Sequence, residues 1–383
     1  MVGQPISKGS LNIALVSPYD FVTPGGVNDH ISNLAIQLRN KGHRVSIIAP
    51  NSKERGHVEG EYFIGRPIPF PSGGSIARIT LSLSVFWQIR KILNEEKFDV
   101  IHLHEPLAPF LPLATLVFSD AINIGTFHAF QGTKLNSIWS IVTRKLFNKL
   151  NSRIAVSLPA MTFVSKYYPA DYEIIPNGVD IDRFSQREGL DKYRDGKVNI
   201  LFLGRMEKRK GFKHLLNAYL EIKQRFPNIR LIVAGGNQPD KGFNGILKNQ
   251  AGLDIEWVGQ ISNADVPKYY QAADIFCAPN TGNESFGIVL LEAMASGKPI
   301  IASEIEGFSQ VMQNGREGIM CEPENEIELS KALVKLIKNV RLRSDMGASG
   351  RLTASKYSWD IIATEIEEIY YKSIFKYSEV GEN

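Results

Sequence analysis

Short apolar runs alternate along this chain with longer segments in which apolar residues recur every three or four positions. Within the short runs the apolar residues are continuous, which is typical of strands covered on both faces of a parallel sheet. A helical pattern follows each run, and this order predicts doubly wound α/β folds. The predicted strands are 12–17, 44–49, 100–104, 123–126, 154–157, 173–176, 198–203, 230–234, 256–258, 275–278, 300–302 and 318–321.

The strand–helix pattern restarts after Pro176-Asn177-Gly178, which we therefore predict to join two domains. A chain of 383 residues is also too long for one typical hydrophobic core. Ligands of open parallel sheets bind beyond the carboxyl ends of the strands. Two such domains facing each other would form one deep cleft, and the motifs described below all follow predicted strands.

Composition places the chain among ordinary globular proteins, with 43% apolar and 22% charged residues. Cys277 and Cys321 lie in apolar runs and are predicted to be buried free thiols in a reducing cytoplasm. No apolar run approaches the ~18–20 residues that a membrane span needs, and no signal peptide is visible. We therefore expect a cytoplasmic protein.

The distribution of charge is more informative than the net charge of +4. No acidic residue occurs from Ala121 to Ala170, and residues 134–150 predict a basic amphipathic helix that contains Trp139. Residues 75–97 predict a second helix of this kind. Such helices lie on anionic bilayers, so we predict peripheral contact with the inner face of the cell membrane. The alternative is that both helices bury their apolar stripes in their own domain.

Two glutamates, Glu284 and Glu292, accompany a helix predicted to open directly after a strand. Ser285 is its predicted N-cap, and Gly297 is the predicted residue after its last turn. A helix start favours phosphate and Glu284 would repel it, so Glu284 suits a neutral hydroxylated group attached to that phosphate. A sugar on a nucleoside diphosphate fits this description. The alternative is a core helix with two incidental glutamates.

A basic loop connects the first strand of the second half to its first helix. Arg205 and Lys210 lie in this loop, each beside a glycine. Two fixed cations near a helix start suit the negative charge that builds on a departing diphosphate. Lys208 and Arg209 are expected to be solvated, with assistance from one of them as the alternative. The alternative is a basic loop without a ligand.

A second loop, Pro24-Gly25-Gly26, follows the first strand and precedes a helix predicted over 27–40. The two glycines would let the backbone approach a diphosphate closely at that helix start. A tight turn without a ligand is the alternative. Tyr19, Asp20 and Asn28 are candidate contacts to the acceptor.

Histidines follow two other predicted strands. His128 is placed where a strand meets the expected cleft. His102 and His104 point to the same face of one strand, and nothing nearby completes a metal-ligand set, so we expect core or cleft-wall roles. Glu105 is expected to support the site or the acceptor.

The motifs together resemble the retaining nucleotide-sugar glycosyltransferases of the GT-B fold, and are most similar to the bacterial phosphatidylinositol mannosyltransferases. The blocks that carry the resemblance occur in the family's order and cover nearly the whole chain. They are P-G-G-V-N-D-H (24–30), H-L-H-E-P-L-A-P (102–109), T-F-H (126–128), P-N-G-V-D (176–180), G-R-M-E-K-R-K-G (204–211) and N-E-S-F-G-I-V-L-L-E-A-M-A-S-G (283–297).

This resemblance implies the GT-B architecture: two doubly wound, parallel-sheet Rossmann-like domains facing each other across a deep cleft. Residues 1–177 would form the domain that binds acceptor and membrane, with a C-terminal helix 359–383 packed back on it. Residues 178–358 would bind the nucleotide sugar. Transfer would proceed on one face of the sugar, with the leaving phosphate accepting the acceptor's proton.

The resemblance also implies roles for individual residues. The catalytic residues would be His128, Arg205, Lys210 and Glu284. The donor would be bound by Gly25, Gly26, Arg205, Lys210, Ile261, Asn263, Glu284, Ser285, Phe286, Gly287, Ile288 and Glu292, with Glu292 on the ribose hydroxyls. The acceptor would be bound by Tyr19, Asp20, Asn28, His128 and Lys134. No dedicated metal or cofactor is expected, and any Mg²⁺ would arrive with the diphosphate.

Three positions depart from the mannosyltransferase pattern. No acid directly follows Ile261, Leu107 replaces an expected polar residue, and Ala129 begins an apolar stretch after His128. We predict GDP-mannose as donor and phosphatidylinositol as acceptor, with a UDP-sugar and diacylglycerol or a soluble acceptor as the alternative.

Other classes of protein fit less well. A dehydrogenase or epimerase would need G-x-G-x-x-G followed by an acid, which the sequence lacks. A non-catalytic carbohydrate-binding module would not need these cations and acids together. Nucleic-acid binding is not expected, because the basic residues have no aromatic stacking platform. The oligomeric state stays open.

Overall fold

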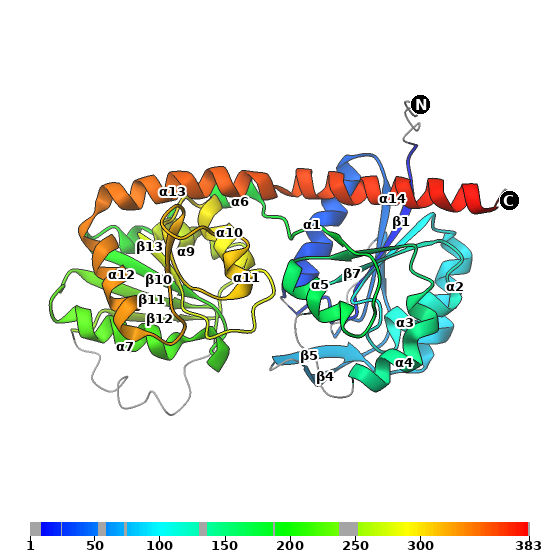
Figure 1. The fold of residues 1–383 in the computed structure, drawn as a ribbon, viewed down its shortest axis with the longest axis horizontal. Coiled ribbons are helices and arrows are strands. Elements are labelled where there is room, and N and C mark those ends of the chain that lie inside the picture. The colour runs from blue at the N-terminus through cyan, green and yellow to red at the C-terminus, as the bar shows by residue number, and fades with distance from the viewer. Residues whose placement is uncertain are drawn as a thin grey trace. The chain divides into compact units, whose positions relative to one another are not determined.

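A computed structural model describes residues 9–23, 25–52, 59–72, 75–129, 136–186, 188–236 and 252–381 (Figure 1). The chain divides into two compact units. Unit 1 comprises Met1–Gly178 and Trp359–Asn383, and unit 2 comprises Val179–Ser358.

Unit 1 is an α/β unit with one large sheet and one hairpin. Its elements are β1 (Asn12–Val16), α1 (Gly26–Asn40), β2 (Arg44–Ala49), β3 (Glu61–Phe63), β4 (Pro67–Ser72), β5 (Ser75–Thr80), α2 (Ser84–Glu96), β6 (Val100–His104), α3 (Leu111–Phe118), β7 (Ile122–Phe127), α4 (Asn136–Phe147), β8 (Ser152–Ala155), α5 (Leu158–Ser165), β9 (Glu173–Ile174) and α14 (Trp359–Gly381).

Unit 2 repeats the alternation of strands and helices. Its elements are α6 (Ile181–Ser185), η1 (Asp191–Tyr193), β10 (Val198–Leu203), η2 (Lys208–Lys210), α7 (Phe212–Lys223), β11 (Ile229–Ala234), β12 (Ile255–Gly259), α9 (Val266–Ala272), β13 (Ile275–Ala278), α10 (Ile288–Ala295), β14 (Ile300–Ser303), α11 (Glu306–Ser309), β15 (Gly318–Cys321), α12 (Glu326–Lys338), α13 (Val340–Ala354) and η4 (Ser355–Tyr357).

Both large sheets are parallel and doubly wound. Their strand orders are β3-β2-β1-β6-β7-β8-β9 in unit 1 and β12-β11-β10-β13-β14-β15 in unit 2. The first strand of each sheet, β1 or β10, therefore lies inside the sheet. Later strands are added first on one side of it and then on the other, so the strand order reverses between β1 and β6 and between β10 and β13. Ligands of this fold bind at that switch point. The prediction of two doubly wound parallel sheets is confirmed.

Each sheet is buried on both faces, as the continuous apolar runs predicted. Ile13, Leu15 and the α1 residues Ile31 and Leu34 form a core on one face of the unit 1 sheet, and Ala14 and Val16 pack into another. Unit 2 likewise has one core under α9 and α10 and another under α7 and α12. The two cysteines are free and buried in unit 2.

The last helix of the chain belongs to unit 1. Trp359, Ile362, Ile366 and Tyr370 of α14 pack into the core that contains α1. A Cβ on Gly178 would lie 2.5 Å from the Trp359 ring, so the chain passes directly beneath this indole where unit 1 ends. None of the described helices is long and apolar enough to cross a membrane.

The helix predicted over 75–97 is wrong in its first part. Residues of β5 pair with β4 in an antiparallel hairpin, and α2 begins only at Ser84. Pro67, Pro69 and Pro71 recur at every second position of β4, so their missing N–H groups all fall on one edge, which is tolerated in a two-stranded sheet. The pattern analysis also missed β3.

Candidate active site

The polar motifs of unit 2 gather at the carboxyl ends of two neighbouring central strands. The loop 204–211 follows β10, and the loop 279–287 follows β13, which pairs directly with β10. A backbone bond from Thr281 N to Arg209 O, 2.8 Å long, joins the two loops. The sheet thus brings the predicted cations and the predicted acid together at its switch point.

Three donors converge on one oxygen of Glu284. Lys210 Nζ lies 2.6 Å, Asn280 Nδ2 2.8 Å and Arg209 NH1 3.3 Å from Glu284 Oε2. Among the described residues no donor reaches the other oxygen, Oε1. Lys210 and Glu284 are 15% and 19% exposed, so the pair is partly shielded from water.

Arg209 connects this acid to a second one. Its Nε donates to Glu207 Oε2 at 2.8 Å, while NH1 donates to Glu284. Arg205 also pairs with Glu207 at 3.0 Å, and its side chain is 56% exposed. The expectation that Arg209 is solvated is therefore wrong, because two carboxylates from different loops hold its guanidinium; Lys208 is exposed.

Glycines permit the close approach of these loops. Gly211 has a φ of 67°, and a Cβ on it would lie 1.7 Å from Pro279 O. Only glycine lets the first loop pass against the second. Similarly, a Cβ on Gly307 would lie 2.1 Å from Glu284 O, so α11 supports the backbone that carries the acid.

Helix α10 begins later than predicted. Its N-cap is Gly287, in a left-handed conformation with φ 88°, and the prediction of Ser285 as N-cap is wrong. Phe286 is 4% exposed and buried in the core, which keeps the chain out of helical geometry until Ile288. Gly297 does follow the last turn, with φ 68° and its N–H donating to Met294 O.

The remaining donor-side candidates lie on neighbouring elements of unit 2. Glu292, on α10, accepts a hydrogen bond from Tyr270 Oη at 2.9 Å. Burial and this acid raise the pKa of Tyr270 well above its ordinary value. Ile261 and Asn263 follow β12, the edge strand, and Asn263 O accepts a hydrogen bond from Arg183.

In unit 1 the predicted glycine loop leads into α1 at the end of β1. Gly25 is the N-cap of α1 in extended conformation, and no side chain caps the helix. No described atom lies within 4 Å of a Cβ built on Gly25 or Gly26. Neither packing nor backbone strain therefore demands these glycines, and the uncapped helix start is open to an anion. Pro24 and Lys134 lie outside the described residues.

The predicted acceptor contacts shape the loop before α1. Asn28 accepts from Ser17 Oγ at 2.9 Å and donates to Asp20 O and Thr23 O, so its amide is used within the loop. Burial alone would raise the pKa of Asp20, but hydrogen bonds from Ser52 and Thr23 outweigh it and lower that pKa. Tyr19 bridges to Ile79 of β5.

His128, which is only partly buried, contacts a cluster of imidazoles at the ends of β6 and β7. His102, His104 and the α1 residue His30 are nearly or fully buried, and the rings of His30 and His128 meet edge to face with centroids 5.1 Å apart. Glu105 Oε1 accepts from the backbone N–H groups of His128 and Ala129, both at 2.7 Å. The described residues contain no group of three His, Cys, Asp or Glu side chains suited to hold a metal ion.

Sequence reasoning missed Arg209, Asn280 and His30. Asn280 could have been found, because it lies two residues after the buried strand β13, and polar residues there mark the ligand edge of a parallel sheet. His30 lies on α1, four residues after Gly26, and no spacing rule connects it to His128.

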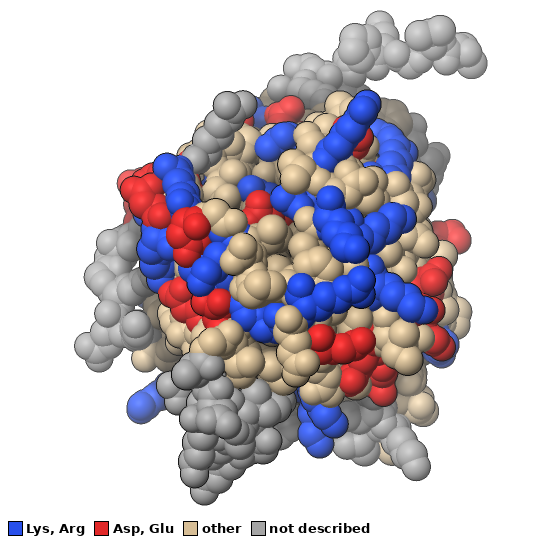
Figure 2. All heavy atoms as spheres, turned by 90° about the vertical axis from the view of Figure 1, so that its left-hand side faces the viewer, with Lys and Arg blue, Asp and Glu red and all other residues tan. Residues whose placement is uncertain are grey.

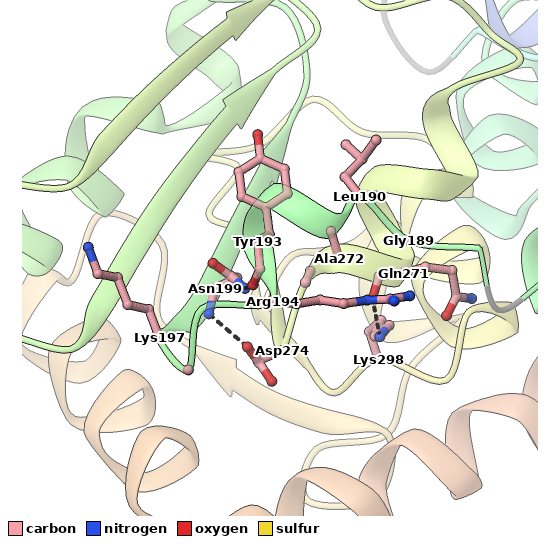
Figure 3. A pocket seen from close by; sticks show the side chains of 12 residues that line it. Gly189, Leu190, Tyr193, Arg194, Lys197, Asn199, Gln271, Ala272, Asp274 and Lys298 are labelled. Atoms are coloured by element: carbon pink, nitrogen blue, oxygen red, sulfur yellow. Dashed lines mark hydrogen bonds between the residues drawn. The ribbon is translucent and has the colours of Figure 1, made fainter.

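A hollow of about 360 Å³ lies at the opposite, amino edge of the unit 2 sheet (Figure 3). Asn199 and Asp274, at the starts of β10 and β13, and Lys298, before β14, are among its lining residues. Lys298 Nζ donates to Gln271 O at 3.0 Å. The hollow contains none of the motif residues, so the motifs and not the hollow define the candidate active site.

Cations and acids gather at the carboxyl edge of the unit 2 sheet, and the family models place the chain among the glycosyltransferases of GT-B architecture, enzymes that use a nucleotide sugar. Residues 182–353 match the family model "Glycosyl transferases group 1", and residues 24–183 match "Glycosyltransferase Family 4". A glycosyltransferase from Rickettsia africae has the same fold (TM-score 0.76, 20% identity, 96% of this chain and 99% of that chain). So does Anabaena HepE in complex with UDP-glucose (TM-score 0.73, 16% identity, 94% of this chain and 100% of that chain).

Several phosphatidyl-myo-inositol mannosyltransferases are similar to this chain over nearly its whole length. The phosphatidyl-myo-inositol mannosyltransferase of Mycobacterium tuberculosis is 36% identical over 372 residues, which cover 94% of this chain and 96% of the relative. The chain belongs to the family of the phosphatidyl-myo-inositol mannosyltransferases.

Proposed function

We propose that the chain transfers mannose from GDP-mannose to the inositol head group of phosphatidylinositol at the inner face of the cell membrane, with retention of configuration. The observation that carries the proposal is the asymmetry of Glu284. Three protein donors occupy Oε2, and Oε1 is left for a ligand. A fixed carboxylate oxygen with no donor from the described residues suits a hydroxyl of a bound sugar.

The same cluster supplies the positive charge for a leaving diphosphate. Lys210 and Arg209 are already ordered by Glu284, so little reorganisation is needed as charge builds on the phosphate oxygens. Arg205, which is more exposed, adds a bidentate donor at the same edge. Any Mg²⁺ would enter with the diphosphate.

This geometry favours transfer on one face of the sugar over a covalent sugar–enzyme intermediate. A nucleophilic carboxylate must present one available oxygen beneath the anomeric carbon. The two cations at Oε2 of Glu284 lower the basicity of the whole carboxylate, which weakens Oε1 as a nucleophile. We assign Glu284 to the sugar hydroxyls, Glu292 to the ribose, and the role of base to the leaving phosphate.

Unit 1 carries an exposed apolar surface that suits a bilayer. Leu83 and Trp87, one turn apart on α2, are 76% and 83% exposed. On α4, Ile138, Ile141 and Val142 are each more than 60% exposed. Helix α3 contacts both α2 and α4, so the three helices lie close together in unit 1 (Figure 1).

Basic side chains accompany this apolar surface. Arg90 and Lys91 follow Trp87 by three and four residues, and Arg144 and Lys145 follow Ile141 by three and four, so each pair lies on the face of its apolar neighbour. All four side chains are exposed. Apolar anchors flanked by cations match an anionic membrane surface.

Unit 2 presents a different kind of surface. Lys and Arg side chains lie among Asp and Glu side chains on the face shown in Figure 2. On α12, Glu328 near the start and Lys335 and Lys338 near the end are exposed, which is the order that the helix dipole favours. We therefore propose unit 1 as the membrane-binding part.

A second candidate is transfer from a UDP-sugar to diacylglycerol or a soluble acceptor. The observation that favours it is the loop after β12, where Ser262 and Asn263 follow Ile261 and no carboxylate is placed to read guanine. Leu107, 7% exposed, also offers no polar group to an inositol ring.

One experiment separates the candidates. The purified chain is incubated with GDP-mannose or UDP-glucose and with anionic vesicles that contain either phosphatidylinositol or diacylglycerol. Mannosylated phosphatidylinositol with an α-linkage, identified by mass spectrometry and NMR, is the expected product. Glucosyl-diacylglycerol would replace the first proposal by the second, and the absence of transfer from either donor would reject both.

A further inference from the structure

The rings of His104 and His128 are joined by a hydrogen bond whose direction can be worked out. His104 ends β6, and His128 lies one residue beyond β7, the neighbouring strand. His104 Nδ1 lies 3.0 Å from His128 Nε2, and the two rings stack with centroids 5.3 Å apart at 28°. In such a pair one nitrogen donates and the other accepts.

Both imidazoles are uncharged. Burial lowers the pKa of His104 and of His128 well below the ordinary value, and the neighbouring histidines lower both further. Each ring therefore carries one proton, on one of its two nitrogens. Two arrangements remain, and they differ in which ring donates.

The second nitrogen of His104 distinguishes them. His104 Nε2 is buried and has no hydrogen-bond partner among the described residues. If His128 Nε2–H donated, the proton of His104 would have to lie on Nε2, leaving a buried N–H with no acceptor. If His104 Nδ1–H donates, His104 Nε2 carries no proton and only its lone pair is left without a partner. Orphaned buried N–H groups are rarer than unused acceptors.

We infer that His104 is a positioning residue that fixes the tautomer of His128. His104 Nδ1–H donates to His128 Nε2, and His128 carries its own proton on Nδ1. His128 Nδ1 has no hydrogen-bond partner in the described part of the chain, so His128 presents an N–H donor to a ligand.

The surroundings hold His104 in this orientation. His102 stacks on its other face, with centroids 4.5 Å apart and an angle of 26°. His102 is itself fixed at both nitrogens, by Tyr370 Oη at 2.7 Å and by Thr126 Oγ1 at 2.6 Å. Helix α14 thus braces the stack through Tyr370.

For the reaction, this tautomer decides what His128 does. Resting on the proposed function, His128 donates a hydrogen bond to a sugar or phosphate oxygen of the bound donor. A neutral imidazole with its proton on Nδ1 and its Nε2 occupied has no lone pair left to act as a base. The proton of the acceptor hydroxyl then passes to the leaving phosphate.

The test is the protonation pattern of His128 in the full-length, ligand-free protein. Nitrogen NMR of ¹⁵N-histidine-labelled protein distinguishes a protonated from an unprotonated ring nitrogen, and the signal of His128 is identified by its loss in His128→Gln. We expect a proton on Nδ1 and none on Nε2. The reverse pattern overturns the inference, even if the protein proves to be an active mannosyltransferase.

Two variants of His104 test its role. His104→Asn keeps an amide N–H near the position of Nδ1, whereas His104→Asp, a side chain of the same size, offers only an acceptor there. We expect His104→Asn to keep the wild-type tautomer and His104→Asp to place a proton on His128 Nε2, with turnover about tenfold lower, the equivalent of one hydrogen bond. An unprotonated His128 Nε2 in folded His104→Asp overturns the positioning role. The spectra are recorded without a nucleotide sugar, so they test the role of His104 even if the proposed donor is wrong.

Discussion

Lys210 Nζ lies 2.6 Å from Glu284 Oε2, although the two residues come from loops that follow different strands. Because β10 and β13 are neighbours in the sheet, their carboxyl ends bring this cation and this acid together. The pair orders both side chains before any ligand binds. In the proposed function, the cation can then contact a phosphate and the acid a sugar hydroxyl without rearrangement of either side chain.

The first prediction concerns this cation. Lys210→Ala should lower turnover by about 10²–10³, as expected when one preorganised charge-stabilising group is lost. Turnover is measured with saturating nucleotide sugar. Lys208→Ala, a change two residues away at an exposed lysine, is the matched control and should leave turnover near wild type. Equal turnover in the two variants would contradict the assignment.

The second prediction concerns Glu284 and its Oε1 atom, which no donor from the described residues reaches. Glu284→Gln keeps the size of the side chain but removes the charge that holds Lys210 and Arg209. We expect turnover to fall by about 10²–10³. Asn280→Ala removes only one donor to Oε2 and should cost about tenfold. A smaller loss in Glu284→Gln than in Asn280→Ala would show that Oε1 does not bind the sugar.

The third prediction concerns the contact between the two loops of unit 2. Gly211→Ala should lower the free energy of unfolding by about 3 kcal/mol or more, because its Cβ would clash with Pro279 O in addition to the left-handed strain. Gly196→Ala is the control, since its φ is 85° but no described atom lies near the added Cβ. It should cost about 1 kcal/mol. Urea unfolding of both variants measures the difference.

The fourth prediction concerns the membrane. Trp87→Ser and Ile141→Ser should each weaken binding to anionic vesicles about tenfold or more, because each removes an exposed apolar anchor. Cosedimentation with vesicles measures the binding. Ile327→Ser, which changes a residue of unit 2 that is 65% exposed, should have no effect. If it weakened binding as much as the other two, unit 1 would not be the membrane-binding part.

The fifth prediction concerns the stability of the folded protein at acid pH. Burial lowers the pKa of His30 from 6.5 to about 4 and that of His102 to about 3. As pH falls from about 7 towards 4 the unfolded chain takes up protons at these sites while the folded chain does not, so stability should decrease over this window. The cost is about 1–2 kcal/mol per histidine at pH 5.

Denaturant midpoints at pH 7 and pH 5 measure this loss. His30→Asn should make the decrease smaller, because it removes one of the buried imidazoles. A decrease of the same size in His30→Asn would mean that other groups cause it.

Much of the fold could be predicted because parallel strands leave a simple pattern. The strands over 44–49, 100–104, 198–203, 275–278 and 318–321 have the predicted bounds. The hairpin β4–β5 could not be found in this way, since it is not a covered parallel strand and its prolines are usually read as breaks. The start of α10 was misplaced because Phe286 packs into the core, a tertiary contact that outweighs the N-cap preference of Ser285.

The sequence predicted which loops form the candidate site, but not the contacts between their side chains. Glycine and charge patterns identified the loops that contain Lys210 and Glu284. They did not identify Arg209 as a bridge between acids, because Glu284 lies 75 residues further along the chain. Distance along the chain also hid His30 of α1, whose neighbours His104 and His128 lie at the ends of two strands far from it in the sequence.

The position of α14 has a consequence for synthesis of the chain. Most of unit 1 leaves the ribosome first, but Trp359, Ile366 and Tyr370, which fill one side of its core, are translated only after the whole of unit 2. Unit 2 is continuous in sequence up to Ser358, so its core needs no later segment of the chain. The core of unit 1 can therefore be completed only after unit 2 has been made.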